Sequence, residues 1–184
     1  MVRILFVFII SVLFQNCCYN GLRNKYDLPR SNNKDLNNKL NKNIFSAIDT
    51  TCFYENIGYY RNSKIFLEKD FSRGKIFIKF YNNGKIAKFI GVGFNQKLYT
   101  ATTNYKILHD DFDASKAYMG YYSLKNNVIT ANQFLNNQCQ MFWVESIIDV
   151  RKDTLIQKYK RFYDNAVYVR RLLPKEFLIY KPDW

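Results

Sequence analysis

The chain has 184 residues, of which 48% are hydrophobic and 18% aromatic, and this composition is too apolar for an intrinsically disordered protein. Its length suits one domain with appended segments. The 16 Phe and 15 Tyr residues favour β-strands. The formal net charge of +13 is compatible with nucleic acid, an anionic lipid or an acidic protein as partner, and does not choose among them.

A short apolar segment begins the chain. It runs from Ile4 to Phe14 after the basic Arg3, with only Ser11 interrupting it. This length is typical of the apolar region of a signal peptide and is too short to span a bilayer comfortably. Residues 1–16 are therefore predicted to be a signal peptide.

The end of this segment, Phe14-Gln15-Asn16-Cys17-Cys18, resembles a bacterial lipoprotein precursor. In that family the apolar region closes on a cysteine that is lipidated and becomes the first residue of the mature protein. The resemblance implies a lipid anchor at Cys17 or Cys18, and a location on the membrane of the cell envelope, on its periplasmic or surface face. A plain secretory signal and an uncleaved anchor are the alternatives.

Residues 17–47 have a different composition, rich in Asn, Lys and Asp. This stretch is predicted to be a solvated tether with a span on the order of 25 to 30 Å. Leu36, Leu40 and Ile44 recur at a spacing of four residues, which makes a short amphipathic helix over 35–46 the alternative for part of it.

A β-hairpin is the clearest element of the folded part. Two apolar runs between Lys75 and Gly91 flank Asn83-Gly84, a pair typical of a two-residue type I′ turn. This register sets Lys79 opposite Lys88 on the outer face. It leaves one wholly apolar face toward the core, formed by Ile76, Ile78, Phe80, Ala87 and Phe89. A three-residue loop would instead set Ile78 opposite Lys88 and mix the two faces.

Other strands are predicted on both sides of this hairpin. A second hairpin turns at Asn126-Asn127, with Tyr122 opposite Ala131 and Leu124 opposite Ile129. Residues 105–115 are expected to form a short helix or a long loop. Strands are expected over 52–60, 140–150, 153–160 and 166–172, with 64–69 as a strand or an irregular approach and 177–180 closing the domain.

About eight to ten short strands with frequent turns predict an all-β, mainly antiparallel domain over residues 48–184, built as a barrel or a sandwich. Four short stretches occur in the order seen in small uncharacterised lipoproteins of Bacteroidetes-type bacteria: Gly58-Tyr59-Tyr60, Phe80-Tyr81-Asn82-Asn83-Gly84, Gly120-Tyr121-Tyr122-Ser123-Leu124 and Lys181-Pro182-Asp183. This resemblance, from about Gly58 onward, implies a lipocalin-like up-and-down barrel with an internal cavity for a small apolar ligand, and it implies no particular ligand.

Two cysteines and one histidine are the candidates for site chemistry. Cys52 and Cys139 are predicted to form a disulfide in an oxidising compartment, with two buried free thiols as the alternative. His109 precedes Asp110 and Asp111, but the chain has no Gly-x-Ser-x-Gly nucleophile motif, and acids beside a histidine on a loop are usually solvated. No enzymatic activity, metal or cofactor is expected.

A basic surface is the remaining candidate. It is predicted to gather Lys79, Lys88, Lys158, Lys160, Arg161, Arg170 and Arg171. The interleaved Tyr159, Phe162 and Tyr168 would suit stacking on single-stranded nucleic acid, but a secreted, membrane-tethered protein rarely meets that partner. The expected function is a non-enzymatic envelope lipoprotein that holds a small apolar ligand. The alternative is an interaction module that contacts an envelope protein or an anionic glycolipid without a ligand cavity.

Overall fold

The computed structural model describes residues 21–31, 48–67, 74–92, 109–137, 140–160 and 164–184. The predicted signal peptide, Cys17, Cys18 and the amphipathic helix predicted over 35–46 lie outside these residues. Within them, no helix has the length and apolar character needed to cross a membrane.

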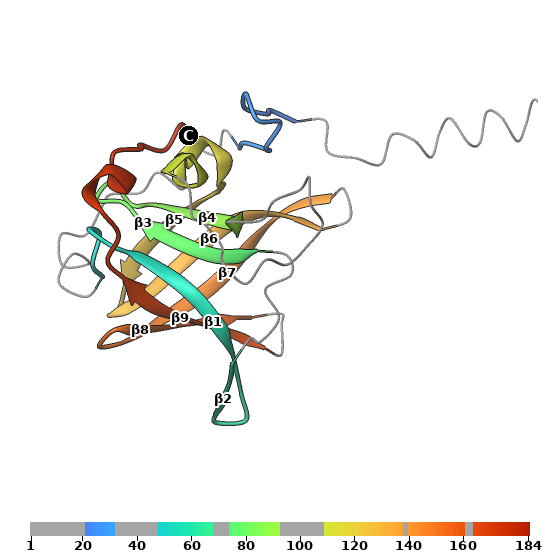
Figure 1. The fold of residues 1–184 in the computed structure, drawn as a ribbon. Helices are drawn as coiled ribbons and strands as arrows, with labels where there is room; N and C mark the ends of the chain where they lie inside the picture. Colours follow the sequence, from blue (N-terminus) through green and yellow to red (C-terminus); the bar gives the residue numbers. More distant parts are fainter. Residues whose placement is uncertain (1–20, 32–47, 68–73, 93–108, 138–139, 161–163) are drawn as a thin grey trace, which may run out of the picture.

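Strands dominate the described residues, and the predicted all-β, up-and-down barrel is confirmed (Figure 1). Eight strands follow one another in the order β1-β3-β4-β5-β6-β7-β8-β9, every pair antiparallel, and β1 pairs with β9 to close the barrel. The ninth, β2, pairs only with the end of β1. The strands are β1 (Phe53–Arg61), β2 (Lys64–Leu67), β3 (Lys75–Phe80), β4 (Lys85–Val92), β5 (Tyr118–Lys125), β6 (Val128–Asn137), β7 (Gln140–Arg151), β8 (Thr154–Tyr159) and β9 (Asn165–Arg171).

The hairpin of β3 and β4 has a different register from the predicted one. Phe80 pairs with Ile86 and Ile78 pairs with Lys88. Gly84 N–H donates to Tyr81 O at 3.2 Å, Tyr81 N–H donates to Lys85 O at 2.9 Å, and Gly84 has a φ of 76°. The loop is therefore a three-residue turn that ends in a left-handed glycine, and the predicted two-residue turn is wrong.

Burial on both faces explains this error. The face that carries Phe77, Ala87 and Phe89 is buried as fully as the face that carries Ile78 and Phe80. A strand with two buried faces does not select its register through an apolar pattern, because neither register exposes apolar surface. The turn geometry decided the register instead.

The second hairpin confirms its prediction. Tyr122 pairs with Ala131 and Leu124 with Ile129. Asn126 and Asn127 have φ values of 51° and 59°, as a type I′ turn requires.

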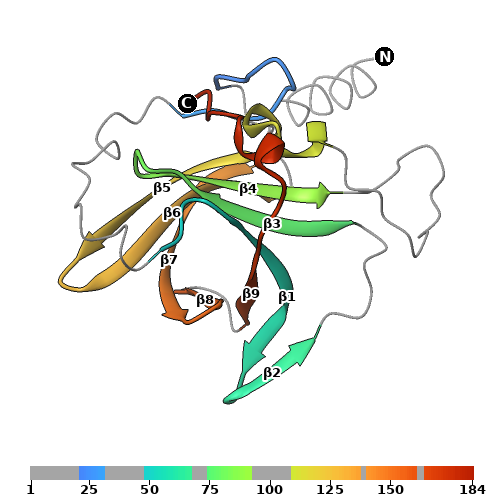
Figure 2. The ribbon, with the colours of Figure 1, turned by 60° about the vertical axis from the view of Figure 1, so that its left-hand side comes forward.

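Two cores share the barrel wall. The inner core includes Ile48 and Cys52, which precede β1, and it lies toward the end of the barrel where β1 begins; we call this the lower end and the opposite one the upper end. The outer core lies between β1, β3 and β4 and three short 3₁₀ turns, η2 (His109–Phe112), η3 (Ala114–Lys116) and η4 (Lys175–Leu178). Figure 2 shows these turns together on one side of the barrel.

Phe112 is the centre of the outer core. Its ring centroid lies 4.4 Å from that of Phe53, 5.1 Å from Phe77 and 5.4 Å from Phe89. The helix or loop expected over 105–115 is thus, from residue 109 onward, a pair of 3₁₀ turns that place one phenylalanine. Within the closing segment expected over 177–180, the first two residues belong to η4, which packs here through Phe177 at 5.7 Å.

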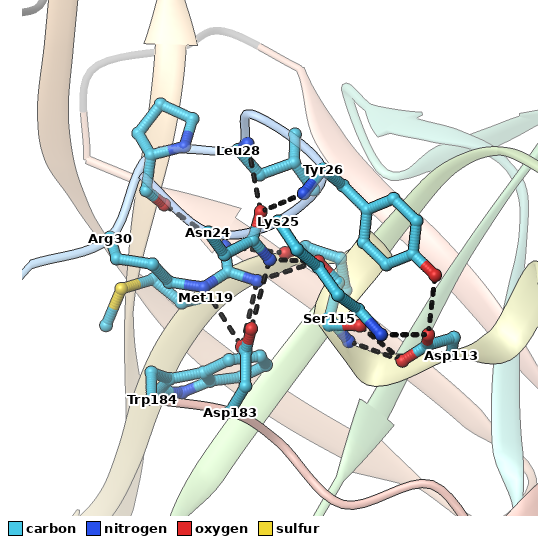
Figure 3. A network of polar contacts seen from close by, with 12 residues as sticks. Asn24, Lys25, Tyr26, Leu28, Arg30, Asp113, Ser115, Met119, Asp183 and Trp184 are labelled. Atoms are coloured by element: carbon cyan, nitrogen blue, oxygen red, sulfur yellow. Dashed lines mark hydrogen bonds and ion pairs between the residues drawn. The ribbon is translucent and has the colours of Figure 1, made fainter. Parts of the chain in front are cut away.

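Residues 21–31, which we call the N-terminal strap, pack on the same side (Figures 1 and 2). Arg30 is 8% exposed. Its Nε donates to Asp183 at 3.0 Å, and its two terminal nitrogens donate to Ala117 O at 3.2 Å and Ser115 O at 2.9 Å (Figure 3). Asn24 donates to the other oxygen of Asp183 at 3.0 Å. This part of the predicted solvated tether is therefore docked on the barrel.

Candidate functional site

Polar side chains lie inside the barrel at mid-height. Side chains alternate between the two faces of a strand, so the observed registers place five polar residues on the inner face, between apolar layers above and below. We call these the inner polar cluster: Lys88 on β4, Gln133 on β6, Ser146 on β7, and Gln157 and Tyr159 on β8. Gln133, Ser146 and Gln157 are fully buried.

A chain of hydrogen bonds connects the cluster. Lys88 Nζ lies 3.3 Å from the Tyr159 hydroxyl, which donates to Gln157 Oε1 at 2.9 Å. Gln157 Nε2 donates to Gln133 Oε1 and to Ser146 Oγ, both at 2.8 Å. The cluster thus joins β4, β6, β7 and β8 across the interior.

Lys88 sets the direction of this chain, because an ammonium group can only donate hydrogen bonds. The Tyr159 oxygen accepts a hydrogen bond from Lys88. Its own proton is therefore directed to Gln157 Oε1, which turns the Gln157 amide nitrogen toward Gln133. Gln133 presents its oxygen to Gln157 and turns its own amide nitrogen away.

Burial keeps two tyrosines of the interior neutral. It raises the pKa of Tyr168 well above 10, and the contact with Tyr159 adds to this. Burial likewise raises the pKa of Tyr122, in the layer below. These two hydroxyl groups therefore stay protonated at neutral pH.

The chain of hydrogen bonds is incomplete at one atom. Gln133 Nε2 has no hydrogen-bond partner, and it is the only buried side-chain nitrogen or oxygen of the described residues in this condition. A buried donor left unpaired costs about 1 to 3 kcal/mol, so such groups are rare in native proteins and need an explanation.

Gly120 makes room for this arrangement. It lies on the inner face of β5, paired with Ile86 on one side and Gln133 on the other. A Cβ at this position would lie 2.8 Å from Ile86 Cγ2 and 3.1 Å from Gln133 Cγ. The glycine therefore lets both side chains lie over β5.

Above the cluster the inner face is apolar and partly exposed. We call this set the upper layer: Ile76, Ile90, Tyr118, Leu135 and Phe142. Ile90 is 53% exposed. The interior therefore changes from filled apolar at the lower end, through polar, to partly exposed apolar at the upper end.

Comparisons of the chain with protein-family models, with curated proteins and with solved structures gave no match.

The two lysines predicted to point outward do not form a solvent-facing pair. Lys79 lies on the outer face but is only 4% exposed, with its ammonium bonded to the carbonyl oxygens of Thr50 and, at 3.3 Å, Cys52. Burial lowers its pKa to about 8. Lys88 points inward, because the one-residue change of register moved it to the inner face.

The other described cations of the predicted basic surface each lie beside a carboxylate, and two of these carboxylates also pair with a second cation, Asp149 with Arg151 and Glu55 with Lys75. Arg161 lies outside the described residues, and each of the other four cations forms an ion pair. The pairs are Lys158 with Asp149 at 3.0 Å, Lys160 with Glu145 at 2.6 Å, Arg170 with Asp49 at 2.5 Å and Arg171 with Glu55 at 2.5 Å. The structure therefore does not gather the predicted residues into one unpaired basic surface.

Cys52, one of the two residues of the predicted disulfide, is a free, buried thiol in this structure. Its Sγ lies 3.5 Å from Asp49 O, and burial raises its pKa. Cys139 lies outside the described residues, so the disulfide stays a prediction.

The acids near His109 have local structural roles. Asp113 accepts hydrogen bonds from Ser115 N–H at 2.9 Å and from its hydroxyl at 2.6 Å, which caps η3. Asp110 accepts from the Tyr180 hydroxyl at 2.9 Å. The His109 side chain lies outside the described part of the chain. Among the described residues, no group of three His, Cys, Asp or Glu side chains could hold a metal ion.

Sequence reasoning missed the glutamines of the inner polar cluster. The signal was present in the second hairpin, where Gln133 follows Ala131 by two residues and so shares its inward face. Gln157 likewise follows Leu155 by two residues. A polar residue at an inward position of a buried strand marks either a polar network or a binding site.

Proposed function

We propose that this protein is a non-enzymatic lipoprotein of the cell envelope, anchored through Cys17 or Cys18, whose barrel carries a small, largely apolar ligand. The observation that supports this proposal most directly is the upper layer, in which inward apolar side chains such as Ile90 stay partly exposed above a buried polar cluster. Elsewhere the same strands bury apolar side chains on both faces. Apolar surfaces with a few converging polar groups are typical of ligand sites.

The architecture supports this proposal. An eight-stranded barrel is wide enough either to be filled by side chains or to hold one small ligand. Ile48 and Cys52 at the lower end are buried, whereas Ile90 in the upper layer is 53% exposed, so a ligand would enter from the upper end.

The strap supports an anchored arrangement close to the bilayer. If Cys17 carries the lipid, the chain between it and Gly21 spans at most about 14 Å. The docked strap would then hold the barrel near the head groups, where amphiphilic molecules are concentrated. The ion pairs on the outer surface do not favour the alternative of a basic interaction module.

Binding of a neutral lipophilic probe tests the carrier function. We expect the full chain to enhance the fluorescence of 1-aminoanthracene in a saturable, one-to-one titration. Ile90→Ser should weaken this binding, because it removes apolar contact area from the upper layer. Leu172→Ser, at an exposed leucine beyond the barrel strands, is the control and should leave it unchanged. No saturable binding, or equal loss in both variants, would contradict the proposal.

Metabolic labelling with an alkyne analogue of palmitate tests the anchor separately. The full precursor should be labelled in bacterial cells, and the Cys17→Ala, Cys18→Ala double variant should not. Label that persists in the double variant would remove the anchor from the proposal and leave the carrier function to stand on the probe titration.

A further inference from the structure

The inner polar cluster carries one positive charge and no negative one. Lys88 forms no ion pair with any described residue, and its polar partner is the Tyr159 hydroxyl. Lys158 on the outer face of β8 and Lys160 directly after this strand, in contrast, are each paired with a carboxylate. A half-buried, uncompensated ammonium group favours an anion nearby.

The unpaired amide of Gln133 points to the same kind of ligand atom. Since Lys88 directs every hydrogen bond of the chain, the atom left over at the far end is a donor, Nε2. A donor is satisfied by an acceptor, and it is fully buried inside the barrel. The cluster therefore ends in a cation on one side and a free N–H donor on the other.

Both groups lie on the same wall of the barrel. Lys88 pairs with Tyr118, and Gln133 pairs with Gly120 two residues further along β5. Gly120 has no side chain to separate them. The partly exposed side chains of the upper layer lie directly above.

We propose that the inner polar cluster binds the carboxylate end of an amphiphilic ligand, with Gln133 Nε2 and Lys88 Nζ as hydrogen-bond donors and the upper layer in contact with the apolar body. This inference rests on the proposed carrier function and defines its ligand class. The carboxylate supplies the two things that the cluster lacks, an acceptor for the amide and a negative charge for the ammonium group. A single buried water molecule is the competing occupant, since it would satisfy the amide without a ligand.

Two probes that differ only in the head group distinguish these cases. The full chain is titrated with 11-(dansylamino)undecanoic acid and with the corresponding alcohol, 11-(dansylamino)undecan-1-ol. We expect the acid to bind about tenfold more tightly than the alcohol at pH 7, an increment typical of one charge-assisted hydrogen bond.

The decisive variant is Gln133→Glu, which keeps the shape of the side chain but places a carboxylate where the donor was. It should abolish the preference for the acid and leave binding of the alcohol within about twofold. Lys88→Met should weaken the acid about tenfold and the alcohol little. Asn132→Asp, on the outer face of the same strand, and Lys160→Met, at an exposed lysine directly after β8, are the matched controls and should preserve the preference.

The outcomes separate the two proposals. If neither probe binds, the carrier function fails. If both probes bind wild-type protein equally, or if the preference survives in Gln133→Glu, the carrier function stands and the carboxylate site is overturned in favour of the water. Binding of the alcohol by each variant shows that the variant is folded.

Discussion

Two buried polar clusters of this barrel differ in one respect, which is whether their hydrogen bonds and charges are complete. The cluster around Arg30 in the strap is matched: all three guanidinium nitrogens donate to oxygens, Asp183 supplies the opposite charge, and the Trp184 ring lies 5.1 Å from the guanidinium carbon (Figure 3). The inner polar cluster ends in an unpaired amide and an uncompensated lysine.

The difference separates a structural role from a binding role. A complete polar cluster specifies how two segments dock, because each polar group contributes little to stability unless all of its hydrogen-bond partners are in place. An incomplete one weakens the folded protein, and such sites are retained where a ligand completes them. The strap cluster docks residues 21–31 on the barrel, whereas we propose that the inner polar cluster is completed by a ligand.

Gly120 connects the two regions, and changing it should have the largest effect. Its inner side faces Gln133, and its carbonyl accepts a hydrogen bond from Trp184 Nε1 at 3.3 Å. Gly120→Ala would place a methyl group 2.7 Å from Asn132 O, so we expect a loss of about 2 to 3 kcal/mol in urea unfolding. Ser123→Ala on the same strand is the control. An unchanged urea midpoint for Gly120→Ala would contradict this expectation and show that β5 can move to make room for the methyl group.

The second largest loss of stability is expected when the complete cluster around Arg30 is broken. Arg30→Met keeps much of the side-chain volume but removes the opposite charge beside Asp183 and one hydrogen-bond donor each from Ala117 O and Ser115 O. We expect a loss of about 2 kcal/mol and faster proteolysis within residues 21–31. Arg23→Met, at a more exposed pair with Asp27, should cost little. Equal protease resistance of both variants would mean that Arg30 does not hold the strap.

Lys79 is intermediate between the two clusters. Its ammonium group donates hydrogen bonds to carbonyl oxygens, but it pairs with no carboxylate among the described residues. Burial lowers its pKa from 10.5 to about 8. Between pH 8 and 10 the unfolded chain therefore binds more protons at this residue than the folded protein, and stability rises with pH.

The measurement is thermal unfolding of wild type and Lys79→Met at pH 7 and pH 9.5. Wild type should gain roughly 1 to 2 kcal/mol relative to the variant between these pH values. The comparison with the variant removes the contribution of other titrating groups. A constant difference would show that Lys79 keeps an ordinary pKa.

The smallest effect on stability is expected where the cluster is incomplete. Gln133→Met removes the unpaired donor, and Gln157 Nε2 keeps Ser146 as an acceptor. Unfolding free energy should change by no more than about 0.5 kcal/mol, although the preference for the acid probe should be lost. A loss of unfolding free energy as large as that of Arg30→Met would mean that Gln133 has a structural role, and the two clusters would then not differ as argued above.

The parts of the fold that were predictable from sequence depended on local rules. Asn126 and Asn127 tolerate positive φ, so the second hairpin was predicted with its register. The register of the first hairpin was predicted wrongly because Phe112 and η4, from segments remote in the chain, cover its outer face. That error carried Lys88 from the interior to the predicted outer surface, and with it the charge of the candidate site.

Local rules also could not predict the docked strap or the inner polar cluster, because both depend on contacts between residues remote in the chain. Arg30 and Asp183 are 153 residues apart, and Gln133 and Gln157 are separated by 24. Whether a polar residue is solvated or buried against a partner depends on which strands become neighbours. Nothing in the residues beside Arg30 indicated a docked segment rather than a tether.

By itself the sequence determined the all-β class and the second hairpin, because alternation and turn residues act over a few positions. The up-and-down barrel was implied by the family resemblance, since the residue patterns alone left a sandwich open. The lipid anchor and the compartment remain predictions from the N-terminal pattern. Only the tertiary structure decided which lysine faces the interior, which polar cluster is complete and which donor is left without a partner. These depend on closure of the barrel, which brings side chains from distant strands within hydrogen-bond distance of one another.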